Sequence, residues 1–210
     1  MKTRPFDVRV ELEGWELFWA RVECCGDHSG LSALRQRIVE GVRDRYRDAA
    51  EIAASPQIAA LRKLFRAVGC DPTRYRPSSE ALLRRLVKGA DLPAIHPLVD
   101  VNTCLSAELG VPCCVMREGS FGPHLVFRAG VAGESYESLR GPFNLENKPL
   151  LVDETGPVDA PITGSTRVMV EPTTSQAWMV AYLPSGVVTG NDARTALGAL
   201  ARDAGVEYPV

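Results

Sequence analysis

The chain lacks the sequence features of a membrane-spanning, exported or disordered protein. No uninterrupted apolar run approaches the roughly 20 residues that a membrane-spanning helix needs. The charged first residues, 1–7, have no apolar segment behind them, so we expect no signal peptide and a cytoplasmic protein. Because 45% of the 210 residues are hydrophobic and 24% are charged, the chain has enough apolar surface to bury a core, which excludes a disordered chain.

Motifs for metals and common cofactors are also missing. The six cysteines include two adjacent pairs, Cys24–Cys25 and Cys113–Cys114, and no CxxC spacing, so a zinc site has little support and we expect reduced thiols. No GxGxxG, Walker, HExxH or GxSxG sequence occurs, so nucleotide-dependent and common hydrolase chemistries lack their usual signatures. We therefore expect neither a metal nor an organic cofactor.

Negative charge is scarce in one part of an otherwise balanced chain. Residues 1–90 hold 17 Lys/Arg and 12 Asp/Glu, whereas residues 91–210 hold 7 and 14, which gives the net charge of −2. Between 61 and 88, only Asp71 and Glu80 oppose eight basic residues. The eight are Arg62, Lys63, Arg66, Arg74, Arg76, Arg84, Arg85 and Lys88. This stretch favours a phosphate-bearing partner, with a plain solvated surface as the alternative.

Apolar periodicity and glycine–proline punctuation predict helices mainly in the first half and short strands in the second. Helices are expected over 32–53, 57–68, 78–89, 96–110 and 191–203. Strands are expected over 6–24 with a break at Gly14, and then over 111–116, 124–128, 135–139, 150–153, 158–162, 167–171 and 177–183. The pattern predicts an α+β fold in which short-stranded mixed or antiparallel sheets lie in layers with flanking helices.

Several segments carry a family resemblance in order along about 60–183. PLVDVNTCLSAELGVP at 97–112, LVFRAGVAGESYESLRG at 125–141 and LLVDETG at 150–156 resemble three motifs of one module. This is the tRNA-binding editing module of the bacterial phenylalanyl-tRNA synthetase beta subunit, its fused third and fourth domains. RPSSEALLRR at 76–85 and LPAIHP at 92–97 look like free-standing versions of the module, which lack a synthetase body.

The resemblance implies a function and a domain plan. A free-standing relative would bind tRNA and hydrolyse mischarged aminoacyl-tRNA in trans, without a metal, because the ester is already activated and the pocket has only to place a water and stabilise an oxyanion. The resemblance implies an editing-module-like core over 56–185. Residues 1–55 would form a strand–helix extension packed on this core, and 186–210 a C-terminal helix of the same domain. The basic stretch would bind the tRNA phosphates.

The family motifs carry over to particular residues. The matched polar positions are Asn102 and Glu134, and Cys114 stands where the synthetase has a pocket histidine. The resemblance implies that these three are the catalytic residues. The substrate pocket is expected to include Thr163, Ser165, Thr166 and Arg167. In the synthetase, a glutamate in this segment recognises the tyrosine hydroxyl, but this chain has no carboxylate between Asp159 and Glu171. The resemblance therefore leaves the amino acid specificity open.

Each candidate residue also has a structural interpretation. An asparagine inside a helix often bonds the backbone, a Gly-Glu pair often marks a turn, and a cysteine without a nearby cation usually acts as a small hydrophobe. The departures at two pocket positions favour a second function, a non-catalytic module that binds tRNA, an amino acid or a small metabolite. A metabolic enzyme on the same scaffold is a third, because fold does not fix function.

Overall fold

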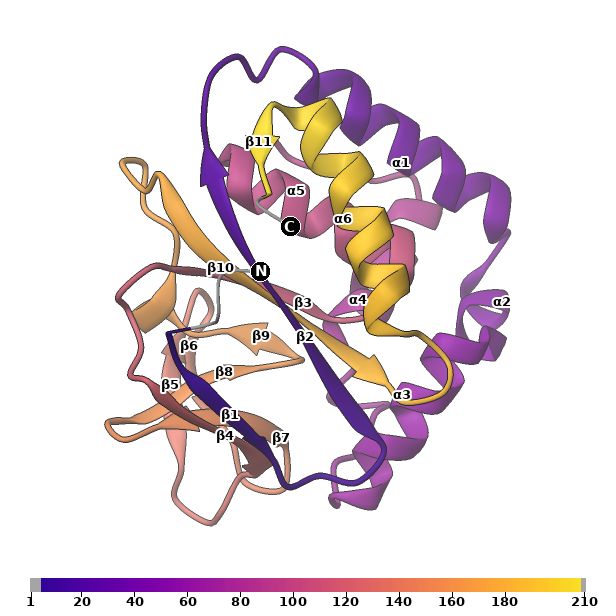
Figure 1. The fold of residues 1–210 in the computed structure, drawn as a ribbon. Coiled ribbons are helices and arrows are strands. Elements are labelled where there is room, and N and C mark those ends of the chain that lie inside the picture. The colour runs from indigo at the N-terminus through magenta and orange to yellow at the C-terminus, as the bar shows by residue number, and fades with distance from the viewer. Residues whose placement is uncertain (1–4, 209–210) are drawn as a thin grey trace.

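The structure is a computed structural model that describes residues 5–208. Helices cover one face of a four-stranded sheet, and a five-stranded sheet lies on the other side (Figure 1). The layered α+β architecture predicted from the sequence is confirmed. No helix within residues 5–208 is long and apolar enough to span a membrane.

The four-stranded sheet joins distant parts of the chain. Its strand order is β11-β2-β10-β3, and every neighbouring pair is antiparallel. The strands are β2 (Trp15–Cys24), β3 (Cys113–Arg117), β10 (Gln176–Pro184) and β11 (Val206–Glu207). All but the first residue of β10 are buried, because one face of this strand meets the helices and the other meets the second sheet.

The five-stranded sheet is mixed. Its order is β1-β4-β7-β8-β9, with β1 parallel to β4 and the other pairs antiparallel. The strands are β1 (Asp7–Val10), β4 (His124–Ala129), β7 (Pro149–Asp153), β8 (Gly156–Ala160) and β9 (Thr163–Gly164). A separate hairpin pairs β5 (Ser135–Ser138) with β6 (Gly141–Asn144).

Aromatic side chains fill the space between the two sheets. The Phe127 ring of β4 lies 5.4 Å from the Trp15 ring and 5.3 Å from the Tyr182 ring, measured between centroids. Phe6, which precedes β1, packs edge-on against Trp19 and Trp178, each at 4.9 Å. These contacts bring β8 and β9 of one sheet towards β3 and β10 of the other, where the candidate site lies.

The helix layer is centred on α5. The longer helices are α1 (Leu31–Arg45), α3 (Pro56–Ala67), α4 (Ser78–Val87), α5 (Pro97–Leu109) and α6 (Gly190–Ala204). Helix α5 contacts α1, α4 and α6 on one side and β3 on the other, so most of its residues are buried. It ends at Gly110, whose left-handed φ of 70° lets the chain turn directly into β3.

Two expected elements differ in the structure. The helix predicted over 32–53 is broken, because α1 ends at Arg45 and Asp48 caps a separate short helix, α2 (Ala49–Ala54). The strand predicted over 167–171 is replaced by the 3-10 turn η1 (Thr166–Val168), whose start is capped by the Ser165 hydroxyl. In both places a polar side chain bonds the local backbone and starts a helical turn, which apolar periodicity does not register.

Candidate functional site

Asn102 lies on the inner side of α5, where the helix packs against β3. Its carboxamide Nδ2 donates to the carbonyl oxygen of Cys113 at 3.3 Å, which ties the helix to the start of the strand. The side-chain oxygen Oδ1 is buried and has no hydrogen-bond partner among residues 5–208. Because an unpaired buried acceptor is unfavourable, Oδ1 is suited to accept a hydrogen bond from a bound water or substrate.

Cys114 follows directly on β3 and faces the five-stranded sheet. It lies opposite Val180 of β10, so its side chain shares a face with Tyr182, two residues further along β10. The residue keeps some solvent exposure. Burial, followed by the negative charge of Asp159, raises the pKa of the Cys114 thiol well above its usual value. At neutral pH this residue is a protonated thiol and a poor nucleophile.

Asp159 of β8 is the residue that the sequence-based site prediction missed. Its carboxylate is only 1% exposed, and Oδ2 accepts a hydrogen bond of 2.6 Å from the Tyr182 hydroxyl. Oδ1 has no hydrogen-bond partner among residues 5–208. Burial raises the pKa of Asp159 to about 7, although the contacts with Tyr182 and Cys114 act in the opposite direction. The only sequence signal was one acidic residue inside an otherwise apolar predicted strand.

Glu134 holds a turn together. Its carboxylate accepts two hydrogen bonds from the Arg128 guanidinium, at 2.6 and 2.9 Å, and one from the Val131 backbone N–H at 2.7 Å. The bonds from Arg128 and Val131 lower the pKa of Glu134 despite its burial, so it stays charged. All of these contacts lie between the end of β4 and the start of β5, and they occupy both carboxylate oxygens.

The polar groups of the 163–166 segment are used to fold it. The Thr163 carbonyl accepts a hydrogen bond from the Tyr136 hydroxyl, and the Thr166 hydroxyl donates to the Glu137 carbonyl at 3.1 Å. The buried Ser165 hydroxyl accepts from the Arg167 backbone N–H at 3.1 Å. The backbone of Gly164 pairs with Asp159, so this segment lies beside that carboxylate.

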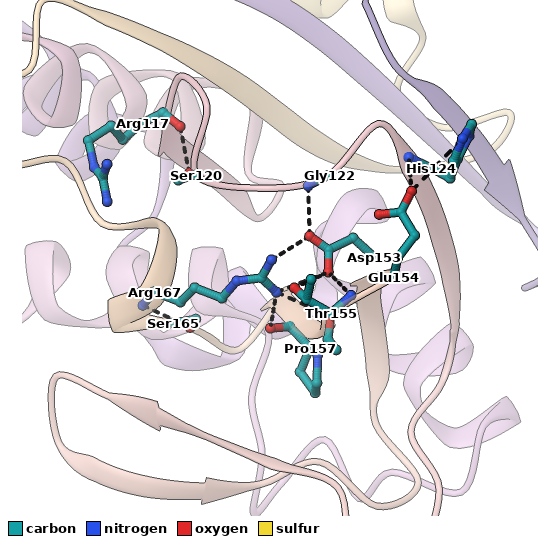
Figure 2. Close-up of polar contacts among 11 residues, drawn as sticks. Arg117, Ser120, Gly122, His124, Asp153, Glu154, Thr155, Pro157, Ser165 and Arg167 are labelled. Atoms are coloured by element: carbon teal, nitrogen blue, oxygen red, sulfur yellow. Dashed lines mark hydrogen bonds and ion pairs between the residues drawn. The ribbon is translucent and has the colours of Figure 1, made fainter.

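Arg167 is directed onto Asp153 (Figure 2). Its guanidinium donates to both oxygens of Asp153, at 2.5 and 3.1 Å, and to the carbonyls of Gly156 and Pro157. Burial alone would raise the pKa of Asp153, but hydrogen bonds from Arg167, Gly122 and Thr155 outweigh it and lower the pKa to about 2. Arg167 is thus the counter-ion of a buried carboxylate.

Four of these residues form one group, which we call the β3 cluster: Asn102, Cys114, Asp159 and Tyr182. Cys114, Asp159 and Tyr182 contact one another across the two sheets, and Asn102 joins them through the carbonyl of Cys113. Thr163 and Ser165 lie next to the cluster through the pairing of β8 with β9. Glu134, Thr166 and Arg167 hydrogen-bond to groups outside the cluster.

The basic stretch divides into two sets. The Glu80 side chain is fully buried, and its Oε1 faces three guanidinium groups. The nitrogen–oxygen distances are 3.0 Å for Arg62, 3.9 Å for Arg76 and 2.9 Å for Arg84. The other five side chains are exposed: Lys63, Arg66, Arg74, Arg85 and Lys88. Only this second set is free of Glu80 and available to phosphates.

Residues 5–208 contain no group of three His, Cys, Asp or Glu side chains placed to hold a metal ion. All six cysteines are free. The β3 cluster thus offers acid, thiol and hydroxyl groups in contact in the described interior.

The chain was also compared with known proteins. The model of the B3/4 domain family matches residues 60–201. No curated protein matches. A solved structure, an N-terminal fragment of the phenylalanyl-tRNA synthetase beta subunit from Pyrococcus horikoshii, is similar with a TM-score of 0.48 and 13% identity, over 96% of this chain and 50% of that one. This chain thus spans half of that fragment. Because the B3/4 model covers most of the sequence, the chain belongs to the B3/4 domain family, as its resemblance to the synthetase module implied.

Proposed function

We propose that this B3/4 domain protein binds tRNA and hydrolyses a mischarged aminoacyl ester in trans at the β3 cluster. One observation carries the proposal: two buried acceptors, Asn102 Oδ1 and Asp159 Oδ1, have no partner among the described residues. They flank β3, the strand on which the family's pocket position falls at Cys114. A site that offers acceptors suits a water molecule, which is a hydrogen-bond donor.

The chemistry follows from these groups. Asn102 Oδ1 would accept a hydrogen bond from one O–H of the attacking water, which keeps that hydrogen, and would orient the water oxygen towards the ester carbonyl. Asp159, whose pKa of about 7 is matched to neutral pH, would accept the second proton as the water adds. The same proton would then pass to the departing ribose oxygen of the tRNA. Cys114 would line the site as a neutral thiol, because its raised pKa disfavours a thiolate.

The tRNA would be held by the exposed basic set on α3, α4 and the loop between them. These five side chains stand on a part of the chain whose two carboxylates are Asp71, at the surface, and Glu80, which is buried. Long-range attraction of the RNA backbone needs no precise geometry, so exposed lysines and arginines suffice for it.

A second candidate function is binding without turnover. It is favoured by the ion pairs of Glu134 and Arg167, which leave two of the family-matched polar residues without a free charge. Such a module would hold tRNA, an amino acid or a small metabolite in a degenerate pocket.

A deacylation assay separates the two functions. The full chain is mixed with a panel of tRNAs that each carry a cognate or near-cognate amino acid, and release of the amino acid is followed against buffer alone. We expect release of one or a few amino acids, reduced at least about 100-fold in Asn102→Ala and Asp159→Asn. The variant Asp44→Asn, at an exposed acid on α1, is the matched control. No release by a folded protein that still binds tRNA would overturn hydrolysis and establish the binding module.

A further inference from the structure

The loop between β2 and α1 is packed tightly against the end of α6. Gly205, with φ of 63°, comes so close that a Cβ there would lie 2.1 Å from the Asp27 carbonyl oxygen and 3.6 Å from His28 Nδ1. On the other side of the loop, a Cβ on Gly30 would lie 2.2 Å from the Asp203 carbonyl oxygen. Two glycines thus allow an approach that other residues would block, and they fix the position of His28.

His28 bridges α6 and Cys24. Its Nδ1 is 3.0 Å from the carbonyl oxygen of Ala204, the last residue of α6. A carbonyl oxygen only accepts hydrogen bonds, so Nδ1 carries the proton and Nε2 keeps its lone pair. Nε2 in turn lies 2.9 Å from Cys24 Sγ, so the thiol donates to the imidazole. The geometry is that of a nucleophile, a base and a group that orients the base.

The end of α6 holds His28 where its Nε2 can act as the base for the Cys24 thiol. The Ala204 carbonyl is among the last four of α6, which have no partner within the helix, so it is free to accept the hydrogen bond from His28 Nδ1. Burial and the neighbouring Cys25 raise the pKa of the Cys24 thiol, so the thiol needs this base to become reactive. Cys24 itself keeps partial solvent exposure.

A surface hollow lies beside His28, and Cys24 is not among the residues that line it. His28 lines a surface hollow of about 290 Å³ between the starts of α1 and α5, together with Ser29, Arg35, His96 and Asp100. Arg35 and Asp100 form an ion pair of 2.6 Å within it. The other charged or titratable groups around His28 are Asp27 on its own loop, His96 before α5, and Asp203 of α6, which is paired with Arg37.

We propose that Cys24 and His28 form a thiol–imidazole site that reacts with low-molecular-weight disulfides. His28 Nε2 takes the thiol proton as Cys24 Sγ attacks one sulfur of the disulfide. The S–S bond of the reagent breaks, a mixed disulfide forms on Cys24, and the released thiolate takes the proton from His28 and leaves as a thiol. Cys24 is oxidised and half of the reagent is reduced. The site is separate from the β3 cluster and does not depend on the proposed hydrolysis.

The test is the rate of mixed-disulfide formation on the full chain. Oxidised glutathione is the probe at pH 7, and intact-protein mass spectrometry follows the first adduct in wild type, Cys24→Ser and the adjacent control Cys25→Ser. We expect one thiol to react at least about tenfold faster than the others, to do so equally in Cys25→Ser, and to disappear in Cys24→Ser. A fast adduct that persists in Cys24→Ser, or equal rates for all thiols, would overturn the proposal.

The role of His28 needs its own variants. His28→Gln and His28→Asn keep a polar side chain, and circular dichroism identifies which of them retains the fold. In the folded variant we expect the first adduct to form about tenfold more slowly than in wild type at pH 7. The difference should be smaller at pH 9, where hydroxide ionises the thiol without the help of His28. A variant that reacts as fast as wild type at pH 7, or one that is equally impaired at both pH values, would contradict a base at this position.

Discussion

At the scale of single residues, Asp159 links the β3 cluster to stability. Burial raises the pKa of this acid from 3.8 to about 7, so the folded protein holds a proton that the unfolded chain releases near pH 4. Its contribution to stability is complete below about pH 4 and is lost as the pH rises through 7. The shift corresponds to at most roughly 4 kcal/mol of unfolding free energy. In Asp159→Asn we expect the fall in stability between pH 5 and pH 8, measured by urea denaturation, to become shallower.

The control for this prediction is Asp44→Asn, which removes an exposed carboxyl group and should leave the pH dependence of wild type intact. If Asp159→Asn and wild type lose stability in parallel from pH 5 to pH 8, Asp159 titrates near its ordinary value. Its proposed role as the base in hydrolysis would then fail as well.

The pKa of Asp153 is shifted in the opposite direction to that of Asp159. Its folded pKa of about 2 lies below the ordinary value, so its stabilising contribution is present above about pH 4 and is lost as the pH falls through 2. Arg167→Leu removes the main partner of this fully buried carboxylate. We expect a loss of about 3 kcal/mol at pH 7. The loss should shrink towards pH 3 as Asp153 becomes protonated, as urea denaturation at the two pH values would show. An equal loss at both would assign the effect to packing.

From the sequence alone, a candidate residue can be named where its partners are local or a motif carries it. Asn102 lies in the motif at 97–112 and Cys114 two residues after it, and the turn at Gly110 brings α5 against the start of β3. Asp159 was not identified, because its partner Tyr182 lies on the other sheet and only the packing of the two sheets brings the pair within 2.6 Å. No periodicity within one strand encodes such a contact.

At the scale of secondary structure elements, Asp48 decides where a helix begins. Its carboxylate accepts hydrogen bonds from the backbone N–H groups of Ala50 and Glu51, at 2.7 and 3.0 Å, and so starts α2. Asp48→Ala should destabilise the protein by about 1 kcal/mol, whereas Asp48→Ser, which keeps a capping oxygen, should lose only part of that. Urea denaturation at pH 7 measures both. Equal losses in the two variants would argue against the cap.

Helix α2 also illustrates which helices and strands can be predicted from the sequence. Apolar spacing gave the long helices and most strands, because a buried face imposes a period on the chain. It did not give the break before Asp48, nor η1 at Thr166–Val168, because a single capping oxygen sets those boundaries. The two-residue strand β11 was also missed, since its pairing with Cys24 and Glu23 is long-range.

At the scale of the whole molecule, the eight basic residues between 61 and 88 have two different roles. Three arginines of the basic stretch neutralise the buried Glu80 and join α3 to α4, so they support the fold. The exposed five have no Glu80 contact and remain available to a partner. In a chain of net charge −2, the proposed tRNA binding would depend on this local charge rather than on the overall charge.

This division predicts which arginines and lysines set the salt dependence of tRNA binding. Replacing Lys63, Arg66 and Lys88 together by Gln should weaken binding and reduce the slope of log affinity against log salt by roughly two, because each lost phosphate contact removes about 0.7–0.9. The matched control neutralises three exposed arginines elsewhere, Arg140, Arg194 and Arg202, with the same change in net charge. Fluorescence anisotropy with labelled tRNA at several salt concentrations gives both slopes. Because the two variants carry the same net charge, equal slopes would mean that the RNA responds to total charge and that α3 and α4 are not its binding surface.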